Sequence, residues 1–461
     1  MMRHFAVHGR KRWSIFSSAA SKHVDQAFCV ALLALVMIAP SLKAQGNEQR
    51  VSLDEAIELA EKNAFEVKAA YHDSLSAEHG LRAAKGAWFP TLSAGGNAVG
   101  FHPQDPLGVG VVQISPDWQE VYATNLRLNY PVYTGGRRTN DIRRQRENLG
   151  AVSSELAATK LANAYDCRQA YIGLLIADRT LGSAEASSKR IAIIQTDVQN
   201  LFAAGMADSI DVLETELSRR SIERLLEESH TRRQNASATL ARLLGTAETD
   251  TIIPTEVIPE PDPLRVGGTE VCGDVARRPE LSVVDHRIES ARYQRSIVRA
   301  SFLPVVNGMG GYALVKPNIG ERESSWQDMW FLGLTLAWDL NLGGKEFSES
   351  SQALEAVRSL EMKRKDLEDS LALQARIAWN NIEGAYAVYG ISREESNIAG
   401  RRFALAEDKQ KAGQMTVNRL LELEAELTET EQQFEAARLK YFAAVTDYLY
   451  AVGSDAIWGG L

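Results

Sequence analysis

Two segments of the chain alternate strictly between apolar residues and polar or small ones. The apolar positions are Leu126, Leu128, Tyr130 and Val132 in the first segment, and Leu332, Leu334, Leu336, Trp338, Leu340 and Leu342 in the second. A period of two residues is that of a β-strand, and about ten residues suffice for a tilted strand to cross a bilayer. The residues predicted to face lipid are Leu334, Leu336, Trp338 and Leu340. A half-buried strand of a water-soluble sheet would show the same period.

Aromatic residues at both ends of these segments favour the membrane. Trp326 and Trp330 lie at one end of the second segment, and Tyr130 and Tyr133 lie at the far end of the first. Aromatic belts of this kind mark the two interfaces of a bilayer. Each segment is preceded by a weaker strand signal rich in glycine and small residues, so we expect two strands in each half of the chain.

Long helices are predicted between the strands. Residues 53–88 have helical periodicity, with Ser52 as an N-terminal cap and Glu55 three residues later. Residues 137–202 and 345–411 contain no proline, and each stretch would form a helix on the order of 100 Å long. Helices of this length exceed a compact domain and indicate an extended body.

Two return helices are predicted over residues 210–244 and 417–452. In the second, apolar residues recur every seven positions, which is typical of a coiled-coil seam. These positions are Leu420, Leu427, Phe434, Tyr441 and Tyr448. The acidic residues expected on the solvated faces of this helix are Glu422, Glu424, Glu426 and Glu431.

The whole pattern of helix, strand pair and helical hairpin occurs twice. Gly205 and Gly413 lie at the two hairpin turns, 208 residues apart, and similar residues follow both glycines. An internal repeat of this size predicts two copies of one structural unit. We therefore divide the chain into a first structural repeat (45–250), a Pro- and Gly-rich connector (251–274) and a second repeat (275–461), which follow a signal peptide (1–44).

The signal peptide is predicted from a basic lead followed by an apolar run at residues 27–39, which is too short to span a bilayer. The formal net charge of −9 argues against nucleic acid as a partner. An exported chain could join Cys167 to Cys272, but their spacing does not require it. No cofactor or metal motif is present, and the repeat-related His72 and His286 are interpreted as packing or surface residues.

Four strands cannot form a closed membrane barrel, for which about eight is the usual minimum. Their two open edges would leave backbone groups unsatisfied in lipid, at a cost of several kcal/mol per group. Membrane strands in this chain therefore require several copies to share one barrel, and the strand number alone allows a dimer or a trimer. The attached helices would continue the cylinder below the membrane.

These features together resemble the TolC-like outer-membrane efflux protein family over essentially the whole exported chain. The residues that carry the resemblance are the helix start 51–56, the helix stops Phe89-Pro90 and Leu303-Pro304, the strand ends 130–136 and 338–344, and the two glycine turns. The resemblance implies a mixed α/β membrane protein made mainly of long α-helices. It implies a homotrimer whose β-barrel has four strands per chain and continues as an α-helical coiled-coil barrel.

By this resemblance the chain is the outer-membrane duct of a tripartite efflux or type I secretion system. It would act as a passive exit conduit that reaches far into the periplasm. Its partners would be outer-membrane lipid, a periplasmic membrane-fusion adaptor and an inner-membrane transporter of the RND, ABC or MFS type. The residues expected at the adaptor-binding tips are Gly205, Asp208, Gly413 and Thr416.

In the family, acidic residues six and nine positions after the tip glycine narrow the pore. The matching positions in the second repeat are Arg419 and Glu422, and their first-repeat equivalents are Asp211 and Glu214. Arg419 reverses the expected charge and argues against a cation-selective ring. Solvated tip residues without a role in the pore would have the same composition.

Two other classes of function find less support in the sequence. An enzyme would need a catalytic constellation, and neither His-Glu-x-x-His nor Gly-x-Ser-x-Gly occurs in the sequence. A soluble periplasmic coiled-coil scaffold is the alternative function, and fractionation separates the two because a scaffold washes off whereas a closed barrel stays with the outer membranes. The sequence therefore favours a duct without enzymatic activity or cofactors.

Overall fold

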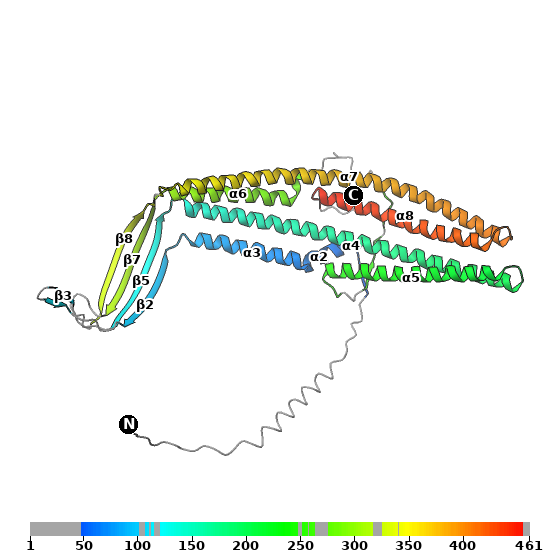
Figure 1. Cartoon of the computed structure of the whole chain (residues 1–461), viewed down its shortest axis with the longest axis horizontal. Coiled ribbons are helices and arrows are strands. Elements are labelled where there is room, and N and C mark those ends of the chain that lie inside the picture. The colour runs from blue at the N-terminus through cyan, green and yellow to red at the C-terminus, as the bar shows by residue number, and fades with distance from the viewer. Residues whose placement is uncertain are drawn as a thin grey trace, which may run out of the picture.

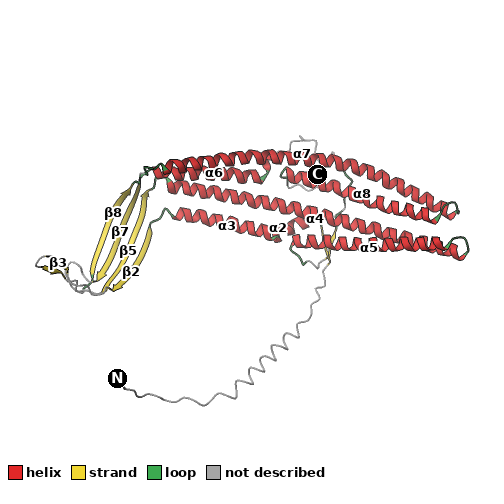
Figure 2. Ribbon diagram, in the orientation of Figure 1, coloured by secondary structure: helices red, strands yellow, loops and turns green. Residues whose placement is uncertain are grey.

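The protein is elongated, with a sheet at one end and a long helical body at the other (Figure 1). This computed structural model describes residues 48–100, 107–109, 112–114, 120–247, 251–256, 258–262, 275–316, 325–339 and 341–454. The predicted signal peptide and Cys272 lie outside these residues. Figure 2 separates the strands from the helices and shows that the sheet joins only one end of the body.

Two long helices run the length of the body, and shorter helices lie end to end beside each of them (Figure 1). The helices are α2 (Leu53–Asn63), α3 (Phe65–Gly86), α4 (Arg137–Ala203), α5 (Ser209–Leu244), α6 (Pro279–Arg299), α7 (Lys345–Lys411) and α8 (Val417–Ala451). Helices α3, α2 and α5 accompany α4, α8 accompanies α7, and α6 packs against both α4 and α7. The predicted bounds of α4, α5, α7 and α8 agree with the structure to within one residue.

The helix predicted over residues 53–88 is broken. The capping box at its start is formed, since Ser52 Oγ accepts from the Glu55 amide and the Glu55 carboxylate accepts from the Ser52 amide. The helix ends at Asn63, and Ala64 adopts an extended ψ of 127° before α3 begins. Asn63 Nδ2 donates to the carbonyl of Leu244 at 2.9 Å. The break thus lies where the end of α5 packs against α2, a contact between residues far apart in sequence.

Four antiparallel strands form the terminal sheet in the order β2-β5-β7-β8. The strands are β2 (Thr91–Gly100), β5 (Glu120–Tyr133), β7 (Val305–Lys316) and β8 (Gln327–Ala337). A small hairpin of β3 (Leu107–Val109) and β4 (Val112–Ile114) lies between β2 and β5 in sequence. The 3₁₀ turn η3 (Ala300–Phe302) leads from α6 to β7. The central pair, β5 and β7, joins the two repeats.

A second small sheet, absent from the sequence prediction, lies at the middle of the body. Strand β1 (Glu48–Val51) pairs in parallel with β6 (Thr251–Pro254), the first residues of the connector. This first part of the connector is not on the surface, because Ile252 is fully buried and its amide donates to Ser237 Oγ at 2.9 Å. Tyr171 Oη donates to the carbonyl of Val51 at 3.0 Å. The turn η2 (Val275–Arg277) then leads into α6.

Apolar side chains from α2, α4, α5, α7 and α8 form the main core around this small sheet, and the free thiol of Cys167 lies within it. A smaller core lies nearer the hairpin turns. The heptad stripe of α8 faces these cores, and Leu420, Leu427, Tyr441 and Tyr448 are all buried. One prediction for this helix is wrong, because Glu424 is fully buried rather than solvated. Its carboxylate is held by a polar network that includes residues of α4.

Candidate functional site

The register of the four-stranded sheet sorts its side chains into an apolar face and a polar face. On the apolar face, Leu126 of β5 is opposite Tyr312 of β7, and Tyr312 is opposite Trp330 of β8. The same face carries Leu92, Leu128, Val306, Leu332, Leu334 and Leu336. These residues are open to the surroundings, with 82% of Leu332 and 73% of Leu334 exposed. Water would disfavour such a surface, whereas lipid would stabilise it.

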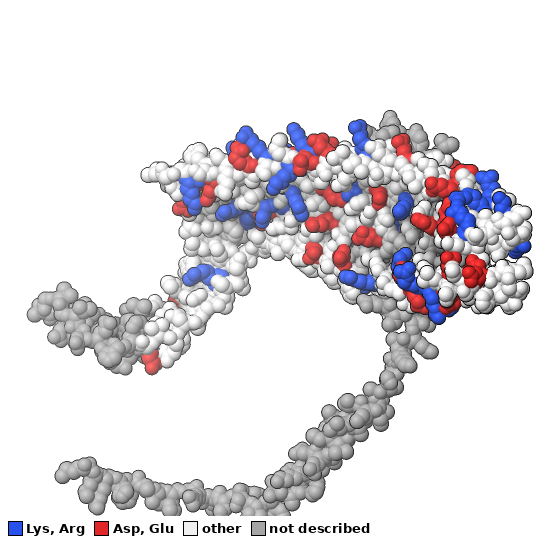
Figure 3. Space-filling view, turned by 45° about the vertical axis from the view of Figure 1, so that its right-hand side comes forward, with Lys and Arg blue, Asp and Glu red and all other residues white. Residues whose placement is uncertain are grey.

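The predicted lipid-facing residues fit this face in part. Leu334 and Leu336 lie on it, and Trp338 follows the end of β8 and is 55% exposed. Leu340 lies outside the described residues. Charged side chains gather over the helical body, and few are seen on the sheet (Figure 3). That distribution matches a sheet in a membrane and a body in water.

The opposite face of the sheet carries most of the polar side chains of the strands, together with Met309, Met329 and Phe331. It carries Ser93, Asn97, Asn125, Arg127, Asn129, Asn307 and Thr335. In membrane barrels the outward side chains are apolar and the inward ones are polar. The polar face is therefore the one that would line the lumen of a closed barrel.

Aromatic and basic side chains meet where the sheet joins the helices. The Arg138 guanidinium lies over the Trp88 ring, 4.4 Å from its centroid, and 5.6 Å from that of Tyr130. Gly135 and Gly136 start α4 with φ values of 62° and 84°, which are easy only for glycine. Side chains are excluded at Gly135 because an added Cβ would lie 2.9 Å from Leu303 Cβ. This junction turns the chain sharply from strand to helix.

Strands β2 and β8 are the edges of the sheet, and neither has a further strand beside it among the described residues. Their outer backbone N–H and C=O groups lie next to an apolar face that favours lipid. Unpaired backbone in lipid costs several kcal/mol per group. The sheet of one chain is therefore an incomplete wall.

At the other end of the body, both hairpin turns use the same helix-ending geometry. Gly205 has φ +75° and Gly413 has φ +70°. The amide following each glycine donates to the carbonyl five residues before it, at 2.8 Å in the first turn and 2.9 Å in the second. These are Schellman motifs, which require a left-handed residue and so favour glycine. Asp208 and Thr416 then cap α5 and α8.

The four candidate constriction residues lie close to these turns but differ in their contacts. Arg419 Nη1 donates to Glu422 Oε2 at 2.5 Å, and both side chains are about half exposed, at 52% and 55%. Asp211 completes the cap of α5 by accepting from the Asp208 amide at 3.0 Å. Glu214 is half-buried on the next turn of α5. The reversed charge of Arg419 is thus neutralised within its own helix.

No helix in the described part of the chain is both long and apolar enough to cross a membrane. The sequence model of the family described as "Outer membrane efflux protein" matches residues 56–246 and 275–454. The chain belongs to this family. It is an outer-membrane efflux channel whose helical body extends into the periplasm, and the family is not enzymatic. Membership of this family excludes the alternative of a soluble scaffold.

Solved structures share the fold of this efflux protein at low sequence identity. VceC from Vibrio cholerae has a TM-score of 0.74 and 16% identity, over 87% of this chain and 96% of that one. CmeC from Campylobacter jejuni has a TM-score of 0.73 and 15% identity, over 87% and 85%. The open state of Neisseria gonorrhoeae MtrE has a TM-score of 0.69 and 17% identity, over 87% and 89%. No curated protein sequence matches the chain.

One functional feature of the efflux protein that sequence reasoning missed is the buried network around Glu424. Its Oε1 accepts from the hydroxyls of Ser187 at 2.7 Å and Thr428 at 2.9 Å, and from Arg190 Nε at 3.1 Å. Arg190 also donates to Glu431 at 3.1 Å. The network ties α4 to α8 near the tips. Its sequence signal was available, since Glu424 lies four residues after one seam leucine and three before another.

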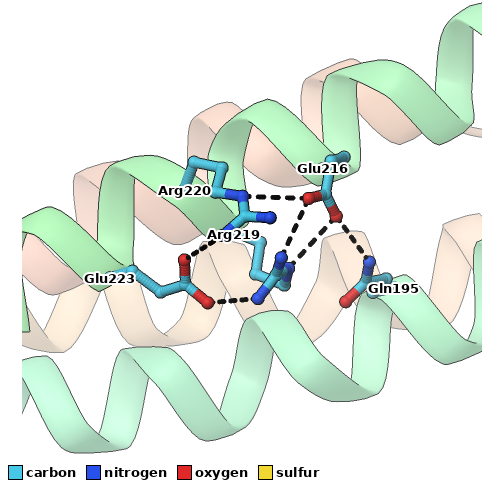
Figure 4. Close-up of polar contacts among 5 residues, drawn as sticks. All are labelled: Gln195, Glu216, Arg219, Arg220 and Glu223. Atoms are coloured by element: carbon cyan, nitrogen blue, oxygen red, sulfur yellow. Dashed lines mark hydrogen bonds and ion pairs between the residues drawn. The ribbon is translucent and has the colours of Figure 1, made fainter.

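The repeat-related position on α5, Glu216, has a different network (Figure 4). Glu216 accepts from Gln195 of α4 at 3.0 Å and from Arg219 and Arg220 of its own helix. Hydrogen bonding to Arg219 lowers the pKa of the Glu216 carboxyl to about 2. Glu223 accepts from both arginines and closes the cluster. The buried network of Glu424 thus joins α8 of the second repeat to α4 of the first, whereas the surface cluster of Glu216 lies within the hairpin of the first repeat.

A second missed feature is an apolar stripe at the first tip. Ile210, Leu213 and Leu217 recur at helical spacing on α5 and are 60%, 69% and 72% exposed. Met206 of the preceding turn is 74% exposed. The second tip has Gln414, Asn418 and Ala425 at the matching places, and its Leu421 is buried. The spacing of residues 210, 213 and 217 was visible in the sequence, but their exposure was not.

Proposed function

We propose that this efflux protein works as a homotrimer that forms a passive exit conduit. The observation that carries the proposal is the four-stranded sheet with two unpaired edges and one apolar face. Three chains with four strands each make twelve strands, above the minimum of about eight for a membrane barrel. Two chains would also reach eight, but channels of this family are typically trimeric.

The sheet edges would join between subunits, with β8 of one chain beside β2 of the next. That pairing satisfies the backbone groups that lipid would leave unpaired. The polar faces would then surround a water-filled lumen, and the helical bodies would continue it into the periplasm. Solutes would pass through without chemical change.

The helical tips would contact a periplasmic membrane-fusion adaptor, which links the duct to an inner-membrane transporter of the RND, ABC or MFS type. Gly205, Asp208, Gly413 and Thr416 shape these tips. The stripe of Met206, Ile210, Leu213 and Leu217 supports the proposal, because water alone would disfavour it on an otherwise charged hairpin. A helix with an apolar face is the kind of partner that this stripe fits.

The narrowest part of the conduit would lie near Asp211, Glu214, Arg419 and Glu422. Their position next to the tips supports this assignment. The Arg419–Glu422 pair gives the second repeat little net charge there, so the charge of the constriction would come from Asp211 and Glu214 of the first repeat.

Site-specific photo-crosslinking in cells tests the tip assignment. A photoreactive amino acid at Leu213 should capture the adaptor, whereas the same group at Leu373, exposed on α7 far from the turns, should not. The assignment is wrong if the Leu213 variant still exports but captures no adaptor while the Leu373 variant does capture it.

A further inference from the structure

Arg127 occupies an unusual place in the sheet. It lies near the middle of β5, opposite Ser93 of β2 and Gly311 of β7. The register puts it on the polar face, on the side opposite to Leu126 and Leu128. A charged residue at mid-strand is costly in lipid but not in a water-filled lumen.

Arg127 is also the sole charged residue on the polar face of the four described strands. The other charged residues of these strands are Glu120, Lys316 and Asp328. All three share the register of the apolar face and lie at the strand ends farthest from the helices: Lys316 is opposite Tyr122, and Asp328 is opposite Leu314. The neighbours of Arg127 on its own face are neutral, and its guanidinium forms no ion pair with any described residue.

We propose that Arg127 of each subunit contributes to a cationic ring inside the barrel that favours anionic solutes. The ring rests on the proposed trimer, in which three copies of Arg127 lie at one height in the lumen. An arginine stays protonated at all physiological pH values, so the ring keeps its charge. With a Debye length of about 10 Å at 0.1 M salt, its field extends about that far from the barrel wall into the lumen.

The tips provide a contrast that places this selectivity in the barrel. Arg419 is paired with Glu422 in the same helix, whereas Arg127 forms no ion pair with a carboxylate in the described part of the chain. The charge reversal at Arg419 therefore produces a neutral pair, and Arg127 produces net positive charge. Solutes with a carboxylate, phosphate or sulfonate group would be concentrated at the ring, and organic cations would be depleted.

A cysteine at Asn129, the next residue on the same face, reports the local potential in the full-length trimer. In a background with Cys272→Ser, Asn129→Cys is treated with an anionic methanethiosulfonate carrying a sulfonate, or with a cationic one carrying a trimethylammonium. The ratio of the two rates cancels changes in thiol reactivity. Arg127→Gln should lower the anionic-to-cationic ratio on the order of fivefold, which is what Coulomb's law gives in water when a unit charge about 8 Å away attracts one reagent and repels the other. The change should shrink at 1 M salt.

Lys316→Gln is the matched control, since it removes the same charge from the same sheet but from the other face. It should leave the ratio unchanged. An equal ratio with and without Arg127, in a protein that still migrates as a trimer, would overturn the ring and leave the proposed duct intact. A wild-type protein that is not a trimer would overturn the proposed function itself.

Discussion

Removing the carboxylate of Glu424 should loosen the packing of α4 against α8. Glu424→Ala deletes the acceptor of Ser187, Thr428 and Arg190 at a position with 1% of the side chain exposed. Ser187 is fully buried and would lose its acceptor. Its helix α4 would then hold a hydroxyl with no partner in a region that water does not reach.

The size of the effect follows from these contacts. A buried polar group left without its partner costs about 1–3 kcal/mol, and each hydrogen bond to a charged group contributes about 1.5–3 kcal/mol. Arg190 keeps Glu431 and Thr428 at 3.1 Å and 3.0 Å, so the full cost of breaking a buried ion pair, about 3–5 kcal/mol, is not reached. We expect about 3 kcal/mol per chain, which raises the equilibrium constant for local opening about 100-fold.

Hydrogen–deuterium exchange of the detergent-solubilised protein measures this opening. Peptides covering residues 183–194 and 420–431 should exchange about 100-fold faster in Glu424→Ala, while peptides from α6 should not change. Glu422→Ala is the matched control, because it breaks an exposed pair worth about 0–1 kcal/mol on the same helix. Equal exchange in the two variants would refute the role of the buried network.

Three further predictions concern the sheet, the tips and pH. Leu334→Arg should cost about 2–4 kcal/mol per chain and lower the yield of membrane-inserted trimer, whereas Thr335→Arg on the polar face should assemble normally; equal yields would contradict the face assignment. In Gly413→Pro, the proline cannot adopt φ +70° and lacks the amide that donates to the carbonyl of Gln410. Export should therefore fall while the trimer persists in the membrane. The control Gly390→Ala, where an added Cβ meets nothing within 4 Å, should export normally. Because the pKa of Glu216 is lowered, its cluster stabilises the fold above about pH 4.5 and loses this contribution as the pH falls towards 2. The thermal midpoint of the wild type should therefore drop more over this range than that of Arg219→Gln. Parallel curves for the two proteins would count against a stabilising role of the cluster.

The long elements were predictable because their signals are local. The helix α7 begins and ends where the sequence predicts, since Gly344 and Gly413 mark its two ends with left-handed backbone and no proline interrupts it. The alternation of leucines in β8 likewise gave the face that the register confirms. The internal repeat strengthened each of these predictions, because every element had a second example.

The missed features depend on contacts between distant residues. The break at Ala64 arises because α2 packs on the end of α5, and β1 pairs with a strand about 200 residues away. The sequence predicts a solvated Glu424 because acidic residues are usually exposed. In the structure, Ser187 and Arg190 of another helix stabilise its buried carboxylate. The residues of the tips were located by the glycine turns, but the exposed stripe on α5 follows from how the two hairpins pack.

The mass of the purified protein in detergent tests the central claim most directly, namely that the sheet of one chain is closed only by other chains. Native mass spectrometry should give one assembly of three chains. Before extraction, the same protein should fractionate with the outer membranes. A folded monomer that needs neither detergent nor partner chains would contradict the account.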